Sequence, residues 1–259
     1  MGTGITAHTL LYNVNKIRYP WRECIQSVLP IADEVIICEC FSTDGTYEDL
    51  IGIVSANPKI RVIRRPWGEK CESLGDHVNA CIQEVRTPYH LQIQGDEILH
   101  EESYPELIRL GKEMTANAAM VHYLHFFGDF DHTYEFMYEK LPRFARTAGG
   151  WVSGGDACAL GGHPPVIDSA IRFHHYGKVS LGREVQAATK EFEFQNMYKH
   201  HGFPDPIIVK AYKEKGRLDY QKLCEEHGRK HTIVGFPGPH PKVMEGYIAT
   251  AKERSQRGE

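Results

Sequence analysis

The stretch Ala32-Asp-Glu-Val-Ile-Ile-Cys-Glu-Cys-Phe-Ser-Thr-Asp-Gly-Thr46 decides the fold class. Its run from Glu34 to Glu39 is short, apolar and continuous, which is typical of a strand buried on both faces. Turn-forming residues follow, and the segment 46–55 then has the character of a helix. A buried strand, a turn and a helix in this order indicate one unit of a parallel α/β sheet.

The same alternation continues on both sides of this unit. Further strands are predicted at 4–12, 61–64, 89–93, 118–127 and 171–175, and further helices at 20–28, 73–85, 105–115, 181–198, 218–227 and 241–254. Strands and helices that alternate at this spacing favour a mainly parallel sheet with right-handed crossovers. We therefore predict an α/β fold with one domain over residues 1–202. A helical or irregular C-terminal extension, residues 203–259, is expected to pack on it.

The composition excludes several classes of protein. The formal net charge is −4 over 259 residues, so no general attraction to nucleic acid is expected. No run approaches the roughly 20 apolar residues that span a bilayer, and the N-terminus lacks the pattern of a secretory signal. We therefore expect a soluble, cytoplasmic protein without a transmembrane segment or a nucleic-acid partner. The oligomeric state stays open.

The cysteines fit the same compartment. There are seven, an odd number, and none forms a C-x-x-C pair. Cys38 and Cys40 lie two residues apart on a predicted strand, so they point to the same face without being able to form a disulfide. Unpaired thiols in a reducing cytoplasm are the economical interpretation, and a zinc ribbon is not indicated.

Candidate binding residues come directly after the predicted strands, because ligands of open α/β sheets bind at the carboxyl ends of the strands. Glu39 ends one strand and could accept hydrogen bonds from a base or from ribose hydroxyls. Ser42 and Asp44 could close the next turn and cap the following helix. The alternative is a solvated acid at a strand end, followed by an ordinary helix cap.

Two further strand ends carry possible metal ligands. Asp96 and Glu97 are adjacent carboxylates after a strand, and Mn²⁺ or Mg²⁺ prefers oxygen ligands. His174 and His175 end another strand, and only one of them can face a given site. An imidazole suits a transition metal as a further ligand. The alternatives are acids at a helix N-terminus, and a chance pair among fifteen histidines.

Several motifs in a fixed order resemble one family. Residues 33–46 resemble the D-E-I-I-V-V-D-x-G-S-T-D-G-T signature of family 2 glycosyltransferases, and Gln94-Gly-Asp-Glu97 stands where that family has its D-x-D metal motif. Other motifs resemble a bacterial and phage branch of the family, with Q-x-D-E and H-Y-G motifs. They are Leu91-Gln-Ile-Gln-Gly-Asp-Glu-Ile-Leu-His-Glu101, His125-Phe-Phe-Gly128, Gly155-Asp-Ala157 and His175-Tyr-Gly177. The resemblance covers roughly residues 4–200.

The resemblance implies a single GT-A domain and a role for each matching residue. Glu39 matches the acid that binds the base, and Asp96 matches the second acid of D-x-D. His175 matches the histidine that completes the metal site. Asp156 stands where an inverting enzyme has its general base, and Glu97 is a supporting partner or the alternative base. Further residues expected to bind the nucleotide sugar are Leu11, Asn13, Ser42, Asp44, Asn79, Gln94, Arg143 and Lys190.

The implied reaction moves a sugar from a nucleotide-diphosphate sugar to a hydroxyl of a glycan or other acceptor, with inversion and with Mn²⁺ or Mg²⁺. Two departures bear on it, since Glu39 and Gln94 both replace an aspartate of the family pattern. One alternative is a nucleotidyltransferase that makes the nucleotide sugar, although Asn13-Val-Asn-Lys16 is not a glycine-rich phosphate loop. The other is a non-catalytic nucleotide-sugar binding protein. A metal-dependent hydrolase lacks the expected H-x-H or H-E-x-x-H pattern.

Overall fold

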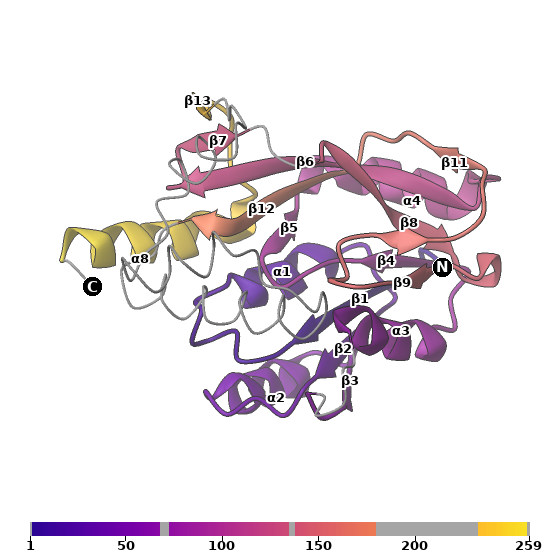
Figure 1. Ribbon diagram of the computed structural model, residues 1–259, viewed down its shortest axis with the longest axis horizontal. Coiled ribbons are helices and arrows are strands. Elements are labelled where there is room, and N and C mark those ends of the chain that lie inside the picture. The colour runs from indigo at the N-terminus through magenta and orange to yellow at the C-terminus, as the bar shows by residue number, and fades with distance from the viewer. Residues whose placement is uncertain (1, 68–72, 135–137, 180–232, 258–259) are drawn as a thin grey trace, which may run out of the picture.

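The computed structural model describes residues 2–67, 73–134, 138–179 and 233–257 (Figure 1). The helices in these ranges are α1 (Trp21–Val28), α2 (Thr46–Ala56), α3 (Leu74–Glu84), α4 (Tyr104–Glu113) and α8 (Glu245–Gln256). The strands are β1 (Ile5–Leu11), β2 (Glu34–Glu39), β3 (Ile60–Arg64), β4 (Tyr89–Gln92), β5 (Glu97–Leu99), β6 (Ala118–Gly128), β7 (His132–Tyr134), β8 (Lys140–Arg146), β9 (Val152–Ser153), β10 (Leu160–Gly161), β11 (Val166–Ile167), β12 (Arg172–Val179) and β13 (Ile233–Gly235).

The central sheet confirms the predicted α/β class. Its main path runs β13-β7-β6-β8-β4-β1-β2-β3, and β1 pairs in parallel with both β2 and β4. β3 extends the parallel part beside β2. Since the predicted bounds of these four strands agree with the structure to within one residue, local apolar pattern and turn chemistry were sufficient to locate them.

The other half of the sheet differs from the prediction. β8 was not predicted, and it lies antiparallel between β4 and β6. It contains Pro142, which cannot donate to the ladder, and the β6–β8 register shifts beside it, between Ala119 and Met120. The last predicted strand, 171–175, proves longer, because β12 continues to Val179 and pairs with both β5 and β6.

Helices cover both faces of the parallel strands (Figure 1). Ile37 of β2 packs in one cluster with Ile25 of α1 and Leu50 of α2. Ile36, its neighbour in the chain, faces the other way and packs with Cys81 of α3. This alternation follows from the two-residue period of a strand. It leaves the carboxyl ends of β1, β2 and β4 along one edge of the sheet.

The described C-terminal part packs on the same core. Met244 is fully buried in the main cluster, and the Tyr247 hydroxyl donates to the Arg18 carbonyl. The predicted helix at 241–254 corresponds to a 3₁₀ turn, Lys242–Met244, followed by α8. The predicted helices at 181–198 and 218–227 and the boundary after residue 202 lie outside the described residues.

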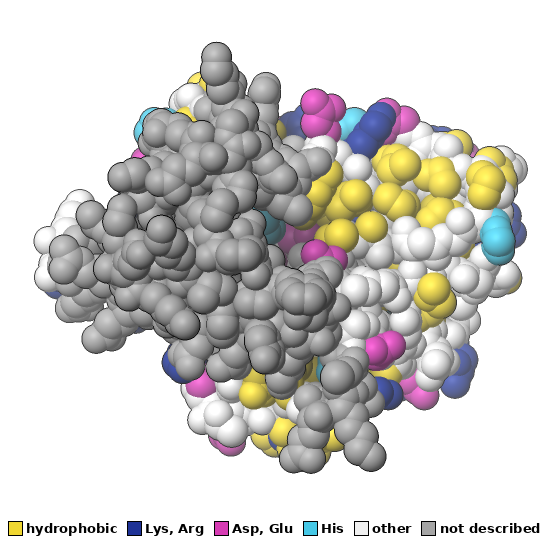
Figure 2. Space-filling view, in the orientation of Figure 1, with side chains coloured by type: hydrophobic (Ala, Val, Ile, Leu, Met, Phe, Trp, Pro, Cys, Tyr) yellow, Lys and Arg dark blue, Asp and Glu magenta, His cyan; other side chains and the backbone are white. Residues whose placement is uncertain are grey.

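On the face of the molecule seen in Figure 2, apolar and charged side chains lie in different areas. Figure 2 shows apolar side chains gathered over the region of β8 and β11, with acidic and histidine side chains visible near the middle of the face. None of the helices in the described ranges has the length and apolar character that crossing a membrane requires.

Candidate functional site

Asp96 and His175 meet at the end of β4. Asp96 lies in the turn between β4 and β5, and its Oδ2 is 3.2 Å from Nε2 of His175 on β12. The β12 strand bulges after His175, and Gly177 lies in this bulge. A Cβ atom at Gly177 would collide with the Asp96 carboxylate, so only glycine allows this approach. The structure thus brings together the two residues that the sequence predicted as metal ligands.

Hydrogen bonds assign the protons of this site. His125 Nε2 is 2.9 Å from the Tyr138 carbonyl oxygen, so Nε2 must donate. Burial lowers the pKa of His125 to about 4, so the ring is neutral near pH 7 and its Nδ1 is an acceptor. His175 Nδ1 lies 2.9 Å from that acceptor and therefore carries a hydrogen. With Nδ1 protonated, Nε2 of His175 faces Asp96, where it either donates a proton to the carboxylate or offers its lone pair to a cation.

The surroundings of Asp96 favour its ionised form. Burial opposes ionisation, but His175 and then Lys178 outweigh it, so the pKa of Asp96 is lowered. The residue is only 7% exposed. An ionised carboxylate and an imidazole nitrogen therefore converge at the mouth of the parallel strands.

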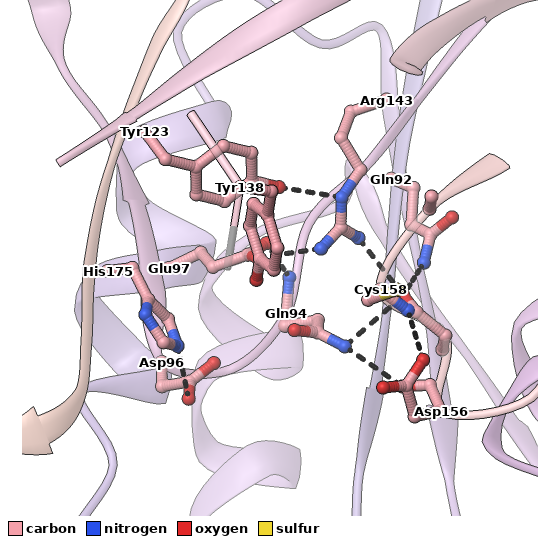
Figure 3. A network of polar contacts seen from close by, with 12 residues as sticks. Gln92, Gln94, Asp96, Glu97, Tyr123, Tyr138, Arg143, Asp156, Cys158 and His175 are labelled. Atoms are coloured by element: carbon pink, nitrogen blue, oxygen red, sulfur yellow. Dashed lines mark hydrogen bonds and ion pairs between the residues drawn. The ribbon is translucent and has the colours of Figure 1, made fainter. Parts of the chain in front are cut away.

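Glu97, the next residue, lies in a different environment (Figure 3). It is fully buried, and its carboxylate accepts hydrogen bonds from Arg143 Nη2 at 2.7 Å and from the Gln94 amide at 2.8 Å. Arg143 is also fully buried, and its Nε donates to the Tyr123 hydroxyl at 2.7 Å. All of these contacts lie inside the protein.

Asp156 lies on a tight turn beside Gln94 and Arg143. The carbonyl of Ala157 accepts hydrogen bonds from Gln92, from Gln94 at 3.2 Å and from Arg143 at 3.2 Å. An ionised aspartate in place of Gln94 could not donate to the Ala157 carbonyl. The glutamine that departs from the D-x-D pattern therefore helps to hold this turn. Asp156 itself is exposed, and Figure 3 shows it on the other side of Gln94 from Asp96.

Asn79 of α3 holds the segment that leads into this turn. Asn79 donates from Nδ2 to the Ser153 carbonyl at 2.9 Å and accepts from the Ser153 amide at 2.7 Å. Asn79 was expected to bind the nucleotide sugar. The structure places both polar atoms of its side chain on the Ser153 backbone, three residues before Asp156.

Glu39 ends β2, on the same edge of the sheet. It is separated from β4 by β1 alone, a span of roughly 10 Å at ordinary strand spacing. Its buried carboxylate accepts hydrogen bonds from the Ser42 amide at 2.6 Å and from Arg64 Nε at 2.8 Å. The Arg64 guanidinium lies 4.0 Å from the centre of the Phe41 ring and 3.9 Å from that of Tyr47.

The loops after β1 and β2 bind one another. The Asn13 amide donates to the Ser42 hydroxyl at 3.0 Å, and Asn13 Oδ1 accepts from the Thr43 amide at 2.8 Å. Asp44 accepts from the Lys16 amide at 2.7 Å. Three of the predicted donor-binding residues therefore also hold this rim together.

The two remaining predictions for this group have different outcomes. Leu11 is fully buried at the end of β1, where its carbonyl accepts from the Cys40 amide. Lys190 lies outside the described residues.

Sequence reasoning missed three residues of this region. Gln92 and Arg64 end β4 and β3, so applying the strand-end rule to every strand would have found them. His125 appeared only as part of a motif. Its position beside His175 depends on the pairing of β6 with β12, two strands separated by 43 residues of chain.

The fold is a single α/β domain with the candidate binding residues at the carboxyl edge of its parallel strands. The sequence matches the model of Glycosyl transferase family 2 over residues 15–159, which is more than half of the chain. The chain therefore belongs to glycosyltransferase family 2, and its single α/β domain has the GT-A fold.

Among solved structures, the chain is similar to TarS 1–349 from S. aureus, with 12% identity over 85% of this chain and 77% of that chain and a TM-score of 0.46. The TarS complex with UDP has 12% identity over 86% and 78%, with a TM-score of 0.48. The complex with UDP-GlcNAc has 11% identity over 85% and 78%, with a TM-score of 0.47. No curated protein sequence matched the chain. The family assignment rests on the sequence match.

Proposed function

We propose that this enzyme transfers a sugar from a nucleotide-diphosphate sugar to an acceptor hydroxyl, with inversion at the anomeric carbon. Mn²⁺ or Mg²⁺ would be held by Asp96 and His175. The observation that carries the metal is the 3.2 Å approach of Asp96 Oδ2 to His175 Nε2. Two electron-pair donors at this distance repel one another unless a cation or a proton lies between them.

The donor set fits the ion. A carboxylate oxygen suits Mg²⁺ and Mn²⁺, while an imidazole nitrogen favours the transition metal of the two. The bond from His175 Nδ1–H to His125 is the support that metal-binding histidines generally have on their other nitrogen. When bound, the cation would neutralise the charge that develops on the leaving diphosphate.

The remaining roles follow from position. Asp156 is exposed on a turn fixed by the Ala157 carbonyl, which supports its role as the base that takes the acceptor proton. The acceptor oxygen then bonds to the anomeric carbon, and the bond from that carbon to the diphosphate breaks. We assign Glu97 and Arg143 to holding this turn and the Asp96 turn in place.

The nucleoside would lie toward Glu39. The roughly 10 Å between β2 and β4 is comparable to the span between a base and its diphosphate. Because the Glu39 carboxylate also binds Arg64 and two backbone amides, we propose that it supports the base site through Ser42 and Phe41 as well as by direct contact.

A thermal-shift screen of nucleotide sugars with Mn²⁺ tests this proposal. A donor near one hundred times its Kd should raise the Tm by roughly 5–10 °C. The shift should vanish in Asp96→Ala and persist in Asp129→Ala, which removes an exposed aspartate paired with His132. A shift that persists in Asp96→Ala and in a chelator would contradict the metal assignment. The anomeric configuration of the product, read by NMR, tests inversion.

A further inference from the structure

A second group of metal-binding side chains lies on the far side of β2 from α1. Cys38 lies on β2, Cys40 directly follows that strand and His77 lies on α3. One ligand atom of each lies within 4.8 Å of the others. All three residues are at most 1% exposed. The two sulfur atoms are 3.9 Å apart.

Cys81 lies beside this group of three, next to Cys38, and offers a fourth ligand. It follows His77 by four residues on α3, so both side chains lie on one face of the helix. Cys81 is fully buried in the same cluster as Cys38 and Cys40, and it also hydrogen-bonds to Cys38. Its thiol contacts the Thr9 carbonyl at 3.6 Å. The group therefore joins a C-x-C strand end to an H-x-x-x-C helix face.

The chemistry of this group differs from that of the Asp96 site. Thiolates and an imidazole are soft or borderline ligands, which suit Zn²⁺ and not Mg²⁺. At a Zn–S distance of about 2.3 Å, tetrahedral geometry separates two sulfur atoms by about 3.8 Å, close to the observed value.

We propose that Cys38, Cys40, His77 and Cys81 bind a structural zinc ion. The ion would tie the end of β2 to α3, directly behind Glu39, whose side chain leaves the opposite face of the strand. Trp67 stacks on the His77 ring at 5.5 Å between centroids and so covers the group. This site is separate from the sugar-transfer chemistry and does not depend on it.

Metal analysis of untagged protein tests the proposal. Protein expressed with added zinc and then dialysed should retain about one zinc ion per chain by elemental mass spectrometry. Cys40→Ser and Cys81→Ser should each lose most of it. Cys158→Ser, which changes a cysteine outside the group, and Asp96→Ala should retain it. Substoichiometric zinc in the wild type, or full zinc in Cys40→Ser, would overturn the proposal.

A second measurement covers the case in which the serine variants fail to fold. Cobalt exchanged into the wild-type protein should give the near-ultraviolet band of cobalt–thiolate bonds and the visible bands of a tetrahedral site. Thiol labelling should also speed up when a chelator removes the metal, because Cys38 and Cys40 lose their ligand bonds. A cobalt-treated protein without the thiolate band, or unchanged labelling, would show that these residues are only packed core.

Discussion

Asp96 and Glu97 are neighbours in the chain with the same charge, and the structure treats them in opposite ways. Glu97 is fully buried and meets donors from Arg143 and the Gln94 amide. Asp96 lies 3.2 Å from Nε2 of His175, where a proton or a cation can lie between them. Burial raises the pKa of Glu97, whereas the pKa of Asp96 is lowered. Glu97 has two donors inside the protein, whereas the partner of Asp96 is an imidazole that can also bind a metal ion.

The comparison teaches how to separate structural from functional carboxylates in one turn. A buried acid with its own donors stabilises the fold, and removing a partner leaves an uncompensated charge. A carboxylate that faces an imidazole nitrogen at a strand end can bind a cation together with it, and cation binding then adds stability. Each prediction below tests one side of this contrast.

The largest change in the free energy of unfolding is expected at the buried ion pair of Glu97 and Arg143. Arg143→Met leaves Glu97 without its cation, and we expect a loss of about 3–5 kcal/mol in the free energy of unfolding. Denaturant unfolding measures it. The double variant Glu97→Leu with Arg143→Met should lose less than the sum of the single changes, since it leaves no unpaired charge. Additive losses would show that the two side chains do not act as a pair.

Asp96→Asn should affect activity more than stability. The new amide can still hydrogen-bond to His175 Nε2, so we expect a loss of stability without metal that is much smaller than that of Arg143→Met. The rate of nucleoside-diphosphate release should fall by about 10²–10³-fold, because a charged ligand of the cation is lost. Steady-state kinetics and a melting curve on the same preparation measure both. A loss of stability as large as that of Arg143→Met would remove the contrast with Glu97.

His125 should affect the metal more than the fold. His125→Phe removes the acceptor for His175 Nδ1–H, and we expect Mn²⁺ to bind about 10–100-fold more weakly. The concentration of Mn²⁺ that gives half-maximal activity measures this. His122→Phe is the matched control, because His122 lies on the same strand but pairs with Asp168 at the surface. Equal effects of the two variants would place His125 outside the metal site.

Sequence reasoning succeeded where the signal is local. The run from Glu34 to Glu39 predicted β2 with the correct bounds, and the strand-end rule together with the family resemblance selected Asp96 and His175, which lie 3.2 Å apart. It failed where a residue's environment comes from distant segments. β8 resembled a loop because Pro142 and Arg143 are unusual in a central strand, and Arg143 is tolerated only through partners 20 and 46 residues away.

The same limit applies to roles within the site. Asn79 and Asp44 carry the polar groups that a ligand would need, and so they were natural candidates. In the structure those groups bond to the backbones of Ser153 and Lys16, and their contacts with a nucleotide sugar stay a prediction. Residue type alone could not show this, because it fixes what a side chain can bond to and not which partner the fold brings to it.

The smallest predicted effect is on the pH dependence of stability. It again distinguishes the buried region around Arg143 from the Asp96 site. His8 and His90 lie near the Arg143 network and bond to each other at 2.9 Å. Burial lowers the pKa of His90 to about 4 from an unfolded value near 6.5, and it lowers that of His8 as well. Above pH 6.5 their contribution to stability is complete. As the pH falls toward 4, the unfolded chain takes up protons that the folded protein does not, so stability declines.

Each such histidine adds a slope of at most about 1.4 kcal/mol per pH unit. We therefore expect His90→Gln to reduce the pH dependence of the unfolding free energy between pH 6.5 and 4 by up to this amount. Asp96→Asn and the exposed His132→Gln should leave the contribution of His90 unchanged. Denaturant unfolding at a series of pH values measures the slopes. If His90→Gln keeps the wild-type slope while Asp96→Asn loses it, the acid sensitivity belongs to the metal-facing pair, and the buried region is not where this protein responds to pH.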